Sequence, residues 1–145
     1  MAAMLAAVFE ILTVGLPFCA FKLIAGFALS QDWLTAWGIA DTLINSANLL
    51  GLILLRRRAT EICLLALLIR LARRPPAALR RRWQQIGTAG DMFFSFVIVA
   101  FMLGGGFLPK LSQLQLQAWN LSVILNVLGA GSMRLSQSVA ELRKI

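Results

Sequence analysis

Apolar residues gather along the chain in four long stretches separated by short polar segments. The stretches run over residues 3–29, 33–55, 87–108 and 114–133. A helix that crosses a hydrocarbon core about 30 Å thick needs about 20 apolar residues, and each stretch meets that length. The pattern therefore predicts four transmembrane helices. The brief connectors between the first two and the last two predict two antiparallel hairpins.

Composition supports the same fold class. Hydrophobic residues make up 59% of the 145 residues and charged residues only 14%. Soluble domains average about 45–50% apolar and about 25% charged residues. We therefore expect one all-α transmembrane domain over residues 1–145, and neither a water-soluble globule nor a disordered chain.

Basic residues concentrate in the segment between the two hairpins, residues 56–86. This segment has a single acid, Glu61, and nine arginines. These are Arg56, Arg57, Arg58, Arg70, Arg73, Arg74, Arg80, Arg81 and Arg82. The positive-inside rule predicts that this loop is cytoplasmic, and four spans then place both termini in the cytoplasm. The composition favours a bacterial inner membrane as the location.

The basic loop contains two further helical patterns. Residues 62–72 form an apolar run that is too short to span, and Pro75 and Pro76 are expected to end it. This run is expected to extend the second span, to lie in the interface or to dock on a partner. Leu79, Trp83 and Ile86 share one face at helical spacing, which predicts a short interfacial helix.

Eight arginines of the loop are candidates for lipid headgroup binding or partner docking. They are Arg56, Arg57, Arg58, Arg73, Arg74, Arg80, Arg81 and Arg82. Basic residues next to a membrane are attracted to anionic lipid headgroups, so the expected first partner is the lipid bilayer. Nucleic acid is not expected, because Trp83 is the only aromatic residue among these charges.

The four tryptophans lie near predicted span ends, which is typical of an aromatic belt at the membrane interface. They are Trp33, Trp37, Trp83 and Trp119. We expect them to face the interface.

Ionisable residues inside the predicted spans are the main candidates for function, because each is costly to bury in lipid. The first span carries Lys22 on a stripe of small residues, and the second carries Asp41 with Asn45 and Asn48 on one face. Lys22 and Asp41 lie at similar depths below the outer ends of their helices, at 1.5 Å per residue. The sequence therefore predicts a Lys22–Asp41 ion pair within the first hairpin.

Three more charged residues belong to this set. Asp91 near the inner end of the third span and Arg134 near the inner end of the fourth are predicted to form a second pair. Glu10 lies on another face of the first span. It is expected to meet Asn48 or Arg56, to face a neighbouring subunit, or to take up a proton. These pairs either lock the helices together or form part of a path for protons or ions.

The chain offers little for enzyme chemistry. It contains no histidine, and its two cysteines, Cys19 and Cys63, are predicted to lie in different environments and to form no disulfide. We expect no cofactor, no metal site and no catalytic residue.

Three functions fit the sequence. The first is a non-catalytic subunit or scaffold of a larger membrane assembly, because the outer loops are short and residues 62–72 have no apparent surface of their own to cover. This reading implies a membrane protein partner or a homo-oligomer. The second is a small oligomeric transporter or channel for protons or ions that uses Glu10 and Asp41. The third is a pore former similar to the holins of phages.

Overall fold

A computed structural model describes residues 2–58, 60–61, 63–74 and 76–142 of the chain. The side chains of residues 2, 3, 77, 133, 134, 136–138 and 140–142 lie outside that description. All regular structure in the described ranges is helical. The elements are α1 (Ala2–Glu10), the π-helix η1 (Ile11–Gly15), α2 (Leu16–Ala28), α3 (Asp32–Leu55), α4 (Leu64–Arg73), α5 (Ala77–Gly104), the 3₁₀-helix η2 (Leu108–Lys110) and α6 (Gln113–Leu142).

Three helical segments of the described chain are long and apolar enough to cross a membrane. They are Met4–Ala28, Asp32–Leu55 and Ala78–Gly104. Their length and their outward-facing leucines and phenylalanines are consistent with an integral membrane protein built as a helical bundle. The fourth predicted span, residues 114–133, lies within α6.

The first of these segments contains a widened turn. Leu16 donates its backbone N–H to the carbonyl of Ile11, five residues earlier, so residues 11–15 form a single π-turn between α1 and α2. Pro17 explains the position of this turn, because it has no N–H to donate to the carbonyl four residues before it. Single π-turns inside α-helices often mark functional sites.

The chain turns back into the bundle after α3. Arg56 adopts the left-handed conformation with φ of 56°, which ends the helix. The described residues that follow, here called the re-entrant segment, are Arg57, Arg58, Thr60, Glu61 and Cys63. Asn48, in the C-terminal half of α3, holds this segment by donating to the carbonyl of Glu61 at 2.7 Å and accepting from the Thr60 N–H at 2.9 Å. Helix α4 therefore begins inside the bundle rather than beyond it.

Helix α4 packs against α5 through small residues. A Cβ atom added to Gly87 would lie 2.6 Å from the Cα of Ala66, so the two backbones are in close contact. The apolar run 62–72 is therefore no extension of α3, and one side of it is covered by its own chain. The residues of the predicted short helix that leads into the third span, Leu79, Trp83 and Ile86, form the first turns of α5, which runs without a break from Ala77 to Gly104.

Aromatic side chains fill the core between α2, α5 and α6. Trp119 of α6 is 1% exposed and packs on Phe21, with 4.8 Å between ring centroids. The expected interfacial position of Trp119 is therefore wrong. Packing of α6 against α2 turns this ring inward, whereas Trp33 remains exposed as expected.

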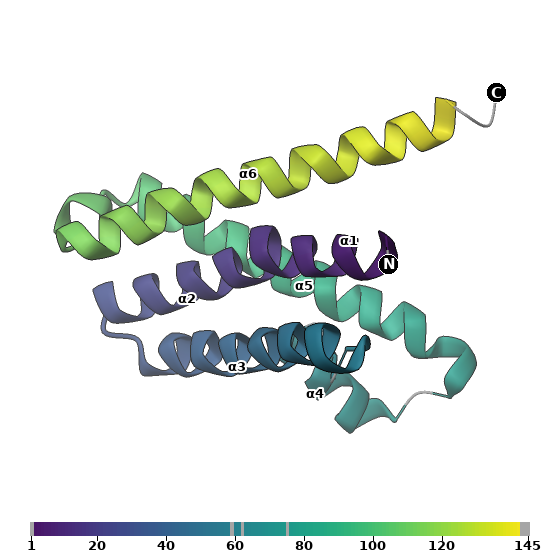
Figure 1. Ribbon diagram of the computed structural model, residues 1–145. Coiled ribbons are helices and arrows are strands. Elements are labelled where there is room, and N and C mark those ends of the chain that lie inside the picture. The colour runs from purple at the N-terminus through teal and green to yellow at the C-terminus, as the bar shows by residue number, and fades with distance from the viewer. Residues whose placement is uncertain (1, 59, 62, 75, 143–145) are drawn as a thin grey trace.

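In Figure 1, α2 and α3 run side by side, whereas α5 and α6 diverge from the turn that joins them. The tight turn at residues 29–31 joins α2 to α3, and residues 105–112 join α5 to α6. The start of α1 and the far end of α6 lie at the same end of the bundle, together with α4 (Figure 1).

Replacement of Gly87 by alanine is expected to destabilise the bundle, because the new methyl group would meet the backbone of Ala66. Over-packing of this kind costs about 1–3 kcal/mol. Thermal unfolding in a mild detergent measures the effect. Gly131→Ala is the matched control, since an added Cβ there meets nothing within 4 Å. Equal unfolding temperatures for the two variants would contradict the α4–α5 contact.

Candidate functional site

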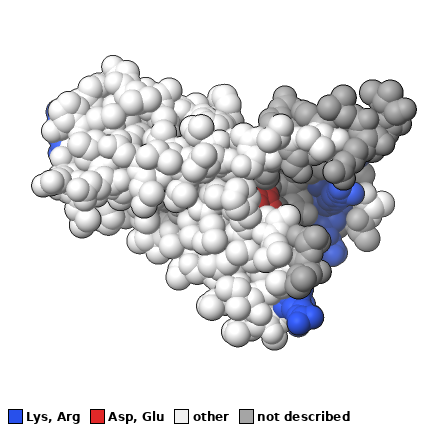
Figure 2. Space-filling model, turned by 45° about the horizontal axis from the view of Figure 1, so that its top comes forward, with Lys and Arg blue, Asp and Glu red and all other residues white. Residues whose placement is uncertain are grey.

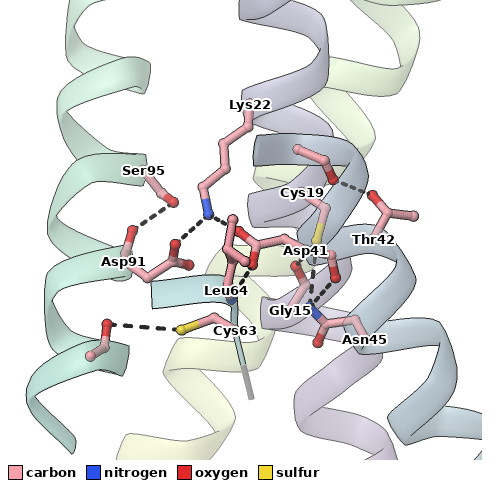
Figure 3. Close-up of polar contacts among 12 residues, drawn as sticks. Gly15, Cys19, Lys22, Asp41, Thr42, Asn45, Cys63, Leu64, Asp91 and Ser95 are labelled. Carbon is pink, nitrogen blue, oxygen red and sulfur yellow. Dashed lines mark hydrogen bonds and ion pairs between the residues drawn. The ribbon is translucent and has the colours of Figure 1, made fainter. Parts of the chain in front are cut away.

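The ammonium group of Lys22 lies at the centre of a buried charge cluster, which consists of Lys22, Asp41 and Asp91. Lys22 Nζ donates to Asp41 Oδ2 and to Asp91 Oδ1, each at 2.5 Å. Figure 3 shows the lysine side chain reaching from α2 between these two carboxylates, which come from α3 and α5. The Lys22 residue has 0% exposure, Asp41 1% and Asp91 6%. Two consecutive helices, α2 and α3, and the more distant α5 therefore meet at one cation.

Asp41 is held by backbone groups as well as by Lys22. Its second carboxylate oxygen, Oδ1, accepts the N–H of Leu64 at 2.6 Å. Leu64 is the first residue of α4. Cys63 stands at the N-cap position before it, but its side chain makes no hydrogen bond to the N-terminus of the helix. The carboxylate therefore satisfies a helix N-terminal N–H, where a negative charge is also favoured by the helix dipole.

Asp91 has a different partner from the one that the sequence predicted. It was expected to pair with Arg134, whose side chain lies outside the described residues. The structure instead places it against Lys22. The reason is the early start of α5 at Ala77, which puts Asp91 fourteen residues into the helix rather than at its inner end.

The cluster carries more negative than positive charge. One ammonium faces two carboxylates, so the ionised group has a net charge of −1 before the dipole of α4 is considered. The ring of Trp37 covers the ammonium at 5.0 Å from its centroid, a favourable cation–π position. Buried charges are costly to desolvate, so the excess carboxylate makes this a natural place for one additional proton or cation.

The small and polar faces predicted on the first two spans meet around the cluster. A Cβ added to Gly15 would lie 2.4 Å from Asn45 Oδ1, so this amide occupies the space above the glycine. Asn45 Nδ2 donates to the carbonyl of Asp41 at 2.9 Å and lies 3.5 Å from the sulfur of Cys19. Small residues thus let α2 and α3 approach closely at the depth of the charges.

Glu10 finds its partner in the re-entrant segment. Arg58 Nη2 donates to Glu10 Oε2 at 2.6 Å, and both side chains are partly exposed. Of the alternatives expected from the sequence, the two within the chain were Asn48 and Arg56, but Asn48 binds the backbone of Thr60 and Glu61, and Arg58 takes the place expected for Arg56.

A cavity of about 90 Å³ lies between this surface pair and the charge cluster. Glu10 and Arg58 line it together with Asp41 and Asp91, and the π-turn supplies Ile11, Val14 and Gly15. Figure 2 shows acidic atoms at the base of a recess beside the basic end of the molecule. The cavity thus connects a partly exposed carboxylate to two buried ones.

The two cysteines line this same cavity, and both are free and buried. The expectation that they lie in different environments is therefore wrong. The re-entrant segment causes this, because it carries Cys63 back to the level of Cys19.

The remaining predicted arginines surround the end of the bundle that holds α4. Arg56 and Arg57 follow α3, Arg73 and Arg74 end α4, and Arg80, Arg81 and Arg82 lie on the first turns of α5. All seven are exposed. In Figure 2 most of the visible basic atoms gather at one end of the molecule.

Three parts of the site had no clear signal in the sequence. Arg58 and Leu64 contact the acids only because the re-entrant segment folds inward, and Ser95 supports Asp91 by donating to its carbonyl at 2.8 Å. The i, i+4 spacing of Asp91 and Ser95 was the one available indication of a polar face on α5.

Comparison of the chain with protein-family models, with curated proteins and with solved structures finds no match. Its function is therefore inferred from the chemistry of the cluster, the cavity and the basic end. The central question is whether the cluster only joins helices or also exchanges a charge with its surroundings.

Replacement of Lys22 by methionine is expected to destabilise the protein strongly, because two carboxylates would remain buried without their cation. Removal of one partner of a buried ion pair costs about 3–5 kcal/mol. The measurement is unfolding by heat or denaturant in mild detergent. Lys110→Met removes the same charge from an exposed site and serves as the control.

The neutralised triple variant Lys22→Met, Asp41→Asn, Asp91→Asn should recover most of the stability lost in Lys22→Met, because no unpaired charge is left. A triple variant that is as unstable as Lys22→Met would argue that packing of the lysine stem, and not its charge, holds the site together.

Proposed function

We propose that this protein is a small transporter or channel that moves protons, or another small cation, through the charge cluster, with Glu10 at the entrance. The proposed topology has four spans in two antiparallel hairpins, with both termini and the arginine-rich end in the cytoplasm of a bacterium. The charge imbalance of Lys22, Asp41 and Asp91 is the observation that carries this proposal.

The excess of negative charge distinguishes this cluster from an ion pair that only joins two helices. One lysine and one aspartate suffice to join two helices, and the second buried carboxylate adds a desolvation cost without adding a cation. Such costs inside a membrane are typical of proton and ion pathways. A proton that binds either carboxylate makes the cluster neutral, and its departure restores the net negative charge.

The cavity favours a proton over a larger solute. A volume of about 90 Å³ has room for a few water molecules and is too small for a larger solute. Lys22 Nζ already occupies the position between the two carboxylates that a metal cation would take. Water in the cavity would connect Glu10 to Asp41 and Asp91, which are the acids able to pass a proton inward.

A subunit of a larger membrane assembly is the second candidate. Helix α4 leaves Leu68 and Leu71 exposed, next to exposed arginines at the basic end. However, α4 covers part of α5 and donates to Asp41 within its own chain, so the need for a partner is smaller than the sequence suggested. Co-purification of a defined partner in mild detergent would favour this function.

Replacement of Asp41 or Asp91 by asparagine is expected to lower proton flux at least tenfold, because the amide cannot ionise. Purified protein in liposomes that contain a pH-sensitive dye, driven by a potassium diffusion potential, provides the measurement. Glu10→Gln should have a smaller effect, since the entrance remains open to water. Folding of each variant is checked by its unfolding temperature.

Asp32→Asn is the matched control, since Asp32 is an exposed acid at the far end of α3. Its flux should equal that of the unaltered protein. The proposal fails if well-folded Asp41→Asn and Asp91→Asn keep full flux, or if the unaltered protein gives no more flux than empty liposomes.

The proposed topology is tested by labelling at two positions, Ser112 in the connection between α5 and α6 and Leu79 near the start of α5. In a cysteine-free background, Ser112→Cys is expected to react with a membrane-impermeant maleimide from outside intact cells. Leu79→Cys should react only after the membrane is opened, because the arginine-rich end is expected inside. Labelling of Leu79→Cys from outside would show that the arginine-rich end faces outward. This result would overturn the proposed topology and the cytoplasmic location of the cavity beside that end.

A further inference from the structure

A second concave site lies at the basic end of the bundle, apart from the charge cluster. It is a surface cleft of about 400 Å³ between α4 and α5, lined by Arg70, Leu71, Arg74 and Arg80. Three of its four lining residues are arginines, and they come from two helices. Arg70 also donates to Glu61 at 3.0 Å, while Arg74 and Arg80 form no ion pair within the described part of the chain. The cleft therefore carries uncompensated positive charge.

We infer that this cleft binds the phosphate of an anionic phospholipid headgroup. This inference does not depend on the proposed transport activity. Guanidinium groups present planar pairs of N–H donors that match phosphate oxygens, and arginine is favoured where such recognition is needed. Converging arginines from α4 and α5 would hold one phosphate between the two helices.

Depth along the helices selects a lipid as the source of the phosphate. Arg80 precedes Gly104, the last residue of α5, by twenty-four residues, which is about 36 Å at 1.5 Å per residue. A hydrocarbon core is about 30 Å thick. When α5 crosses the membrane with Gly104 at one surface, the cleft at Arg80 therefore lies at the headgroup level of the other surface.

The surroundings of the cleft suit a molecule with a charged head and an apolar tail. Leu71 lines the cleft and is 61% exposed, so it offers an apolar surface beside the arginines. Arg73 packs over the ring of Trp83 with 5.9 Å to the centroid, and tryptophan is common at headgroup depth. A zwitterionic lipid fits less well, because its ammonium group would face the arginines.

Binding of phosphatidylglycerol to the purified protein in a neutral detergent tests the inference, with phosphatidylcholine as the zwitterionic comparison. Native mass spectrometry gives the affinity, and the rise in unfolding temperature gives a second readout, because the headgroup would join α4 to α5. The unaltered protein should bind phosphatidylglycerol in preference to phosphatidylcholine.

The variant Arg74→Gln/Arg80→Gln is expected to weaken phosphatidylglycerol binding about 25-fold, at about fivefold for each arginine. Arg80→Gln alone should give about fivefold and covers the case in which the double variant does not fold. The control Arg56→Gln/Arg57→Gln removes the same charge from exposed residues outside the cleft, and should change binding by less than about twofold.

Three results would overturn the inference. If the double variant binds like the unaltered protein, the cleft has no role in lipid binding. If the control variant loses as much affinity, the attraction comes from overall charge. If inorganic phosphate alone raises the unfolding temperature as much as the lipid does, the cleft is a site for a free anion instead.

Discussion

The ammonium group of Lys22, buried between two carboxylates, is the interaction on which the rest of this structure depends. A charge in a medium of low polarity must be surrounded by opposite charge and by donors or acceptors. Here these groups come from α2, α3, α5 and the N-terminus of α4. The need to satisfy one cation therefore fixes how these four elements lie relative to one another, and apolar packing alone would leave their register free to vary.

Two irregular parts of the backbone, the π-turn and the re-entrant segment, lie near this cation. The π-turn at residues 11–15 lines the cavity, and the re-entrant segment brings Arg58, Cys63 and Leu64 to the acids. Non-helical backbone inside a membrane protein is tolerated only where other groups satisfy it, and Asn48 and Asp41 provide those hydrogen bonds. The proposed proton path and the proposed lipid site are both consequences of this inward fold, since α4 has Asp41 at one end and the arginine cleft at the other.

Residue patterns predicted where helices form, but they predicted only some of the contacts between helices. Length and apolarity suffice to predict a spanning helix, because its backbone hydrogen bonds are satisfied within the segment. Lys22 and Asp41 were matched by comparing their depths in two adjacent helices, and the structure brings them together. Asp91 was assigned elsewhere because the third span was expected to begin at residue 87, which placed Asp91 at its end, whereas α5 begins at Ala77. Trp119 was expected at the interface because tryptophan often lies there, but packing against Phe21 takes it into the core.

The amino-acid sequence by itself indicated that lipid rather than water surrounds most of this protein and that its structure is helical. It also showed that positive charge concentrates between the second and third apolar stretches. These properties depend on composition and on periodicity along one segment at a time. Only the tertiary structure decided which charges meet, where the chain re-enters the bundle and which surfaces form the cavity and the cleft. The physical reason is that a buried charge interacts with whatever lies within a few ångströms, and residues 22, 41, 64 and 91 become neighbours only after the helices have packed.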